Sequence, residues 1–170
     1  MTKKKGSLFL ELNFLLLVLA MLFSGFSQGM ITIWQNIDSV NDHIYLGRVS
    51  RDLLAILEYQ LTLHTTTAKI QKVGDRCIIH CYGLGGARRK SFFCKKYPQT
   101  NDYGFYQETQ SMGNEPGTNP LSPPDIGVTG FQVIPLSTKM VRVNFTLTIL
   151  ATGRHKAYTG ILYLRNGVIL

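Results

Sequence analysis

The sequence predicts an α+β protein in which one long N-terminal helix packs on an antiparallel β-sheet. First, Leu12–Trp34 is a stretch of 23 residues without a formal charge, long enough to cross a membrane as a helix. Second, apolar residues after this stretch recur at three- and four-residue steps, which is typical of an amphipathic helix. Third, after Thr67 the pattern changes to short alternating runs separated by turn residues, which is typical of strands.

The predicted helix has a membrane half followed by an amphipathic half. No proline occurs before Pro98, so nothing in this region interrupts a helix. We predict one helix from Ser7 to about Leu63, roughly 85 Å long at about 1.5 Å per residue. Gly25 and Gly29 form a GxxxG pattern, which fits either close helix–helix contact or a point of local unwinding. The apolar residues of the amphipathic half are Ile37, Val40, Ile44, Val49, Leu53, Ile56, Leu57 and Leu61.

The remainder, residues 65–170, is predicted to be a β-rich globular head. From Tyr97 to about Ile126 the chain contains five of the six prolines, which predicts a long loop. In residues 141–149 apolar and polar side chains alternate, as in a half-buried antiparallel strand. The predicted strands lie within Ala68–Tyr82 (with a turn at Gly74-Asp75), Arg88–Tyr97, Tyr103–Gln107, Gly127–Ile134, Met140–Leu150 and Ala157–Leu164.

Composition and motifs argue against a catalytic function. The net charge is +8, and +5 without Lys3, Lys4 and Lys5, which is too mild to establish a polyanionic partner. The sequence contains no Walker loop, no dinucleotide fingerprint and no recognisable pair of nucleophile and base. We therefore predict no enzymatic activity, no cofactor and no metal site.

Three interpretations of the N-terminal segment are open from composition alone. Lysines followed by an apolar run predict a simple membrane anchor with its N-terminus in the cytoplasm. The second interpretation is a cleaved signal peptide, with a cleavage site formed by small residues near Gly25-Phe26-Ser27. Glu11 fits neither of these well, because a carboxylate within an apolar membrane segment costs a few kcal/mol and usually marks a function.

The third interpretation accounts for Glu11 together with the residues around it. KKKGSLFLELNF, with basic residues, then Gly6, then an apolar run carrying Glu11 five positions later, resembles the N-terminal signal of type IV pilins and type II secretion pseudopilins. The resemblance implies cleavage by prepilin peptidase between Gly6 and Ser7, followed by methylation of the amine of Ser7, a position where the family usually has Phe. It also implies that Glu11 faces the N-terminal ammonium group of a neighbouring subunit, or its own before assembly.

The head resembles that of minor pilins and minor pseudopilins, in GFYQETQ, VTGFQVIPLSTKMVRVNFTLTI and YTGILYLRN. Together these resemblances imply a pilin-like fold with a leader (1–6), a membrane and filament-core half of the helix (7–34), an amphipathic half (35–64) and the head (65–170). They imply a structural subunit of the cytoplasmic membrane that enters, initiates or caps an extracellular or periplasmic filament. Its partners would be other pilins, prepilin peptidase and assembly platform proteins. The alternatives are a pseudopilin of a type II secretion system and a competence-pilus subunit that binds DNA.

Cys77, Cys81 and Cys94 are the three cysteines. A two-residue hairpin turn at Gly85-Gly86 would place Cys77 directly opposite Cys94, in a close pair that suits a disulfide bond. We predict this bond, with Cys81–Cys94 as the fallback if the turn lies at Arg88-Arg89. A zinc site formed by Cys77, His80 and Cys81 is disfavoured, because His80 would face away from both cysteines on a strand.

A cluster of basic residues surrounds the same predicted hairpin. Basic side chains bind phosphate groups, and interleaved aromatic rings such as Phe93 can stack on bases, so the cluster is a candidate surface for DNA or another anion. The competing interpretation is an ordinary solvated hairpin whose aromatic residues enter the core. The basic residues are Arg88, Arg89, Lys90, Lys95 and Lys96.

Overall fold

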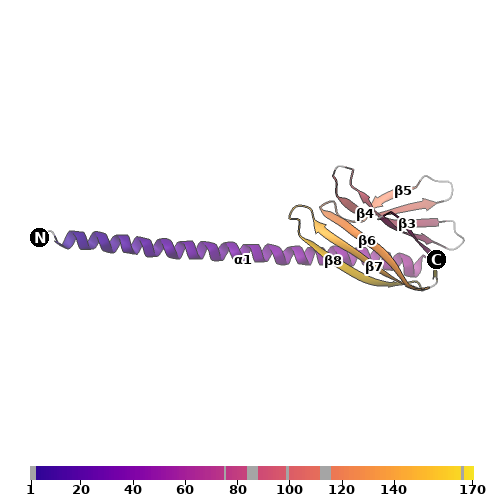
Figure 1. Ribbon diagram of the computed structural model, residues 1–170, viewed down its shortest axis with the longest axis horizontal. Coiled ribbons are helices and arrows are strands. Elements are labelled where there is room, and N and C mark those ends of the chain that lie inside the picture. Colours follow the sequence, from indigo (N-terminus) through magenta and orange to yellow (C-terminus); the bar gives the residue numbers. More distant parts are fainter. Residues whose placement is uncertain (1–2, 75, 84–87, 99, 112–115, 166) are drawn as a thin grey trace. The chain divides into compact units, whose positions relative to one another are not determined.

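The computed structural model describes residues 3–74, 76–83, 88–98, 100–111, 116–165 and 167–170. The chain divides into two compact units, Met1–His43 and Ile44–Leu170. One α-helix, α1, extends from Lys3 to Leu63 and contributes to both units (Figure 1). The predicted long helix and the α+β fold class are therefore confirmed, and the helix begins four residues earlier than Ser7.

In the second unit, the described strands form two sheets instead of the single sheet that the sequence predicted (Figure 1). The larger has six strands in the order β5-β4-β3-β2-β1-β9, and the smaller has three in the order β6-β7-β8. All pairs are antiparallel except β1 with β9, which are parallel. The strands are β1 (Thr67–Val73), β2 (Arg76–Tyr82), β3 (Arg88–Lys96), β4 (Tyr103–Ser111), β5 (Gly117–Pro120), β6 (Ile126–Ser137), β7 (Met140–Ile149), β8 (His155–Tyr163) and β9 (Val168–Ile169).

The predicted strands all occur, but the loop after Tyr97 is more ordered than expected. Strand β4 continues to Ser111 instead of ending near Gln107, and it pairs with β5. In the β5 sequence GTNP, three of the four residues are of types that are depleted in strands. Strand β9 has two residues, too few to show a periodicity. Gly74 has φ of 60°, as expected at the predicted turn between β1 and β2; Asp75 lies outside the described residues.

One stripe of α1 forms the centre of the head. Its buried leucine and valine residues are separated by three or four positions, so they lie on one face of the helix. Leu57 borders a small space with Phe105 from the six-stranded sheet and Phe145 from the three-stranded sheet. Both sheets therefore pack on the same helical stripe, and the buried residues of that stripe are Leu46, Val49, Leu53, Leu57 and Leu61.

Strand β8 lies close to the helix because it carries a glycine there. A Cβ atom added at Gly160 would lie 2.7 Å from a methyl carbon of Leu54. The hydroxyl group of Thr62 also donates a hydrogen bond to the carbonyl oxygen of Tyr163, at 3.1 Å. These contacts hold the C-terminal half of α1 under β8.

Candidate functional site

The N-terminal part of α1 is an apolar surface. Among the described residues, one helix, Leu8–Leu63, is long and apolar enough to cross a membrane, and none of its most apolar stretch is buried. This is compatible with a single membrane-spanning segment.

The exposed apolar side chains include a regular seam along this part of the helix. They are separated by three or four residues, the spacing with which one helix packs against another. Beyond Phe26 the opposite side of the helix is mixed, with Gln28, Gln35 and Asp38 beside the exposed Ile31. We call the following residues the apolar seam: Leu8, Leu12, Leu15, Leu19, Leu22, Phe26, Met30, Ile33, Ile37 and Val40.

The residues of the predicted processing site lie in the first turns of α1. Gly6 and Ser7 are helical, and the side chain of Glu11 is exposed. Ser7 and Glu11 are four residues apart in α1, which is about 6 Å along the helix axis. Cleavage after Gly6 would place the new amine of Ser7 one turn from the carboxylate of Glu11.

The cysteines show the predicted strand register but not the predicted disulfide. Ile79 pairs with Phe92 and Ile78 with Phe93, so the next position places Cys77 opposite Cys94 as expected. All three cysteines are nevertheless free thiols. A backbone hydrogen bond from Val133 acts on the thiol of Cys77, and Cys77 and Cys94 line the same pocket. Cys77 and Cys94 thus lie opposite each other as free thiols, and the bond between them stays a prediction.

The fallback pairing is wrong, because Cys81 lies opposite Lys90. Arg88 and Arg89 are part of β3, so they do not form the turn; Gly85-Gly86 lies outside the described residues. Burial raises the pKa of the Cys81 thiol to about 11 and that of Cys94 to about 12. The two thiols are therefore protonated and unreactive at neutral pH.

The five predicted anion-binding residues do not share one surface. Side chains alternate between the two faces of a strand, so Lys90 and Lys96 lie on the face of β3 that carries the buried Phe92, whereas Arg89 and Lys95 lie on the other face. Arg89 forms an ion pair with Glu108 at 3.6 Å. The structure describes Arg88 only as part of β3.

Lys96 is close to an aromatic ring, which it shares with Arg76, a basic residue outside the predicted five. The ammonium group of Lys96 lies 5.8 Å from the ring centre of Tyr103, and the guanidinium group of Arg76 lies 5.9 Å from the same ring. Cation–π contacts of this kind stabilise a side chain in place. The basic residues of β3 therefore serve several local contacts and do not form one anion site.

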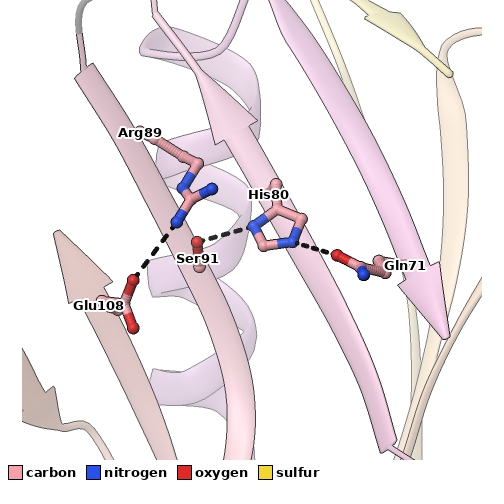
Figure 2. Close-up of polar contacts among 5 residues, drawn as sticks. All are labelled: Gln71, His80, Arg89, Ser91 and Glu108. Carbon is pink, nitrogen blue, oxygen red and sulfur yellow. Dashed lines mark hydrogen bonds and ion pairs between the residues drawn. The ribbon is translucent and has the colours of Figure 1, made fainter. Parts of the chain in front are cut away.

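A polar cluster on the outer face of the six-stranded sheet was not predicted. Figure 2 shows the ring of His80 between Ser91 and Gln71, with its Nδ1 atom 2.8 Å from the Ser91 hydroxyl oxygen and its Nε2 atom 3.0 Å from Gln71 Oε1. Burial, followed by the positive charge of Arg89, lowers the pKa of His80. The cluster joins side chains from three consecutive strands, β1, β2 and β3, and so it needs the pairing of all three.

The distance between His80 Nδ1 and the Ser91 hydroxyl oxygen would suit a catalytic pair of base and nucleophile, but no other feature of the cluster does. Ser91 is 2% exposed, so a substrate cannot reach its hydroxyl group. His80 faces away from Cys77 and Cys81, as predicted, and the described part of the chain contains no group of three side chains suited to a metal ion. The arrangement satisfies buried polar groups and offers no open catalytic site.

Comparisons of the chain with protein-family models, with curated proteins and with solved structures found no match.

Proposed function

We propose that this chain is a minor pilin-like structural subunit, cleaved after Gly6 and incorporated into, or initiating or capping, a type IV pilus or a related filament. The observation that carries the proposal is the difference in burial between the two parts of α1. Its stripe from Leu46 to Leu61 is buried in the head, whereas the apolar seam from Leu8 to Val40 is exposed. A helix that anchors a head at one end and presents an apolar seam at the other suits assembly through helix packing.

The glutamate within the apolar run supports the same proposal. An ammonium group and a carboxylate attract each other strongly in a low-dielectric environment, and the loss of one partner leaves the other buried at a high cost. The pair that the resemblance implies, Glu11 with the processed amine of Ser7 on a neighbour, would therefore fix the axial register of the subunits. A pseudopilus of a type II secretion system would use the same features.

The proposed location follows from the charges at the start of the chain. Lys3, Lys4 and Lys5 precede the apolar run and would stay in the cytoplasm, so that the head lies on the far side of the membrane. Before assembly the chain is a single-pass protein of the cytoplasmic membrane. After assembly its head belongs to a periplasmic or extracellular filament.

N-terminal sequencing of the mature protein tests the processing step. A chain that begins at Ser7 is the expected result, and its amine can be checked for a methyl group by mass spectrometry. A chain that begins near Gln28 would show conventional signal cleavage, and an intact Met1 would show a plain anchor. Either of these two results would overturn the proposal.

The variant Glu11→Gln tests the assembly step, because it removes the charge and keeps the size of the side chain. We expect normal cleavage after Gly6 but loss of the chain from sheared filaments. Asn13→Ala is the matched control, since it also changes a polar residue of the apolar run and should enter filaments normally. Wild-type amounts of Glu11→Gln in filaments would show that charge pairing does not control assembly.

A further inference from the structure

Strand β8 has one side without a partner strand. It is the last strand in the order β6-β7-β8, and no strand of the described residues pairs with its other side (Figure 1). Two backbone hydrogen bonds show which residues of β8 bond to β7: Leu164 N–H donates to the carbonyl oxygen of Lys139, and Ile149 N–H donates to the carbonyl oxygen of Arg154. Even-numbered residues of β8 therefore bond to β7, and odd-numbered residues direct their N–H and C=O groups away from it.

The free edge of β8 is accessible. The residues that direct backbone groups outward are His155, Ala157, Thr159 and Ile161, all of which are exposed. The Tyr163 carbonyl, at the end of the same edge, already accepts the hydroxyl hydrogen of Thr62. A shallow depression of about 570 Å³ lies beside the edge on the outer face of the sheet, lined by Ala157, Thr159, Ile161, Arg142, Asn144 and other residues of the three strands.

The other sheet ends differently. Its outer strands are β5, with four residues including Pro120, and β9, with two residues. Short strands and proline at a sheet edge prevent pairing with other chains, as expected of a protected edge. Strand β8 has nine residues, no proline, and exposed Ile161 and Tyr163 side chains on its outer face. It lacks the protection that the six-stranded sheet has at both of its edges.

The sheet that contains this edge carries charge of one sign. From Ile126 to Leu170 the sequence contains five basic residues and no Asp or Glu. Arg142 pairs with Ile161 across β7 and β8, so its side chain lies on the outer face, one strand away from the edge. An additional strand paired with β8 would lie about two strand spacings, or roughly 10 Å, from Arg142. The basic residues are Lys139, Arg142, Arg154, Lys156 and Arg165.

We propose that the free edge of β8 binds an extended segment of another protein that carries carboxylates at alternate positions. Backbone hydrogen bonds to residues 155–161 would supply affinity, as when a peptide adds a strand to an open sheet. Carboxylates on the outer face would be drawn to the basic sheet and to Arg142. A second copy of β8 is a poor occupant, because it would bring the same one-sign sheet against itself.

Short synthetic peptides as long as β8 test the proposal on the full chain in detergent micelles. One peptide alternates glutamate with valine, and the matched peptide alternates lysine with valine. We expect the glutamate peptide to bind at least about tenfold more tightly at low salt, with a difference that shrinks as salt is added. Hydrogen exchange should show new protection at the amides of Ala157, Thr159 and Ile161. Equal binding of the two peptides, or protection elsewhere only, would overturn the proposal.

Methylated peptides test the strand geometry without changing the protein. Paired residues of an antiparallel sheet point to the same face, so the glutamate residues should supply the backbone groups that bond to β8. N-methylation at the glutamate positions should abolish binding, whereas the same number of methyl groups at the valine positions should leave it unchanged. If both methylated peptides bound equally well, backbone pairing would be excluded.

Two protein variants complete the test. Thr159→Pro removes an outward N–H group and spares every backbone bond to β7, while Thr159→Val keeps the N–H group. Both variants lose the hydrogen bond that the Thr159 hydroxyl group donates to Asn144 Oδ1, so Thr159→Val is the matched control. We expect loss of binding in the first variant only, with both checked for folding by circular dichroism. An oligonucleotide that bound the basic sheet while the glutamate peptide did not would assign the surface to nucleic acid and overturn the proposal. None of these measurements depends on cleavage at Gly6.

Discussion

Replacing Leu57 with alanine should destabilise the head and leave the membrane half of α1 unaffected. Leu57 is 1% exposed and belongs to the helical stripe on which both sheets pack. Its side chain borders a small space whose other walls are Leu53, Phe105, Val128, Phe131 and Phe145.

The size of the effect depends on whether these walls can move into the space left behind. A buried Leu→Ala change costs roughly 2–5 kcal/mol, and the cost is highest where the surroundings stay in place. The three phenylalanine rings stand on β4, β6 and β7, and the rings of Phe105 and Phe131 are already in contact, with centroids 4.9 Å apart. We therefore expect a loss of about 4 kcal/mol, which lowers Tm by about 15 °C in a unit of this size.

The assay is urea and thermal unfolding of the full chain in micelles, followed by near-ultraviolet circular dichroism of the tyrosine rings of the head. Ile44→Ala is the matched control, because Ile44 is on the same helix but 57% exposed, and it should cost less than about 0.5 kcal/mol. Recovery of Leu57→Ala in the membrane fraction should equal that of wild type. If the two variants were equally stable, the buried stripe would not be the centre of the head.

Two further predictions concern titratable groups of the head. Burial raises the pKa of the Cys81 thiol to about 11 and that of the Cys94 thiol to about 12. We therefore expect iodoacetamide at pH 8 to alkylate these thiols about a hundredfold more slowly in the folded chain than in urea, as measured by mass spectrometry of each site. Equal rates in the two states would contradict the burial of these thiols. Because the pKa of His80 is lowered from 6.5 in the folded state, the unfolded state binds its proton more readily. The stability that neutral His80 contributes should therefore be complete above about pH 6.5 and should be lost as the pH falls toward the lower folded-state pKa, and His80→Gln should flatten this part of the stability profile. Parallel profiles for wild type and His80→Gln would contradict that assignment.

The parts of the fold that sequence reasoning found are those that local chemistry determines. A proline-free segment with apolar residues at helical spacing predicted α1, and its observed end at Leu63 agrees. The register of β2 with β3 followed from the short connection between them, because a hairpin's turn fixes which residues oppose each other. These features depend on neighbours in the sequence, and so the sequence displays them.

The features that were missed depend on contacts between distant segments. The hydroxyl group of Tyr97 lies 2.8 Å from Ser122 Oγ and 2.9 Å from the carbonyl oxygen of Pro123, which ties the start of the proline-rich loop to its end. Gly104 makes room for this ring, since a Cβ atom there would lie 2.5 Å from it. No local pattern marks Tyr97 as an anchor, and so the loop appeared less ordered than it is.

The residues of the candidate site also fall into those that the local sequence reveals and those that it does not. The spacing of Gly6 and Glu11 is local and visible in the sequence, whereas the His80 cluster needs the pairing of three strands. The anion patch failed as a single surface because residues adjacent in a strand face opposite sides of the sheet. A run of basic residues is therefore a poor guide to a surface when the run lies on a strand.

The distribution of charge along the chain gives the proposed cleavage a second consequence. Residues 44–170 contain fifteen basic and seven acidic side chains, which equals the whole net charge of +8, whereas the three lysines of residues 1–43 balance three carboxylates. Removal of residues 1–6 would take away all three lysines and leave Glu11, Asp38 and Asp42 with a single new ammonium group. The exported helix would then be acidic beside a basic head. Because like charges repel along parallel copies of one helix, the proposed processing would favour neighbours whose helices carry basic residues over neighbours identical to this chain, as the proposed role of a minor subunit requires.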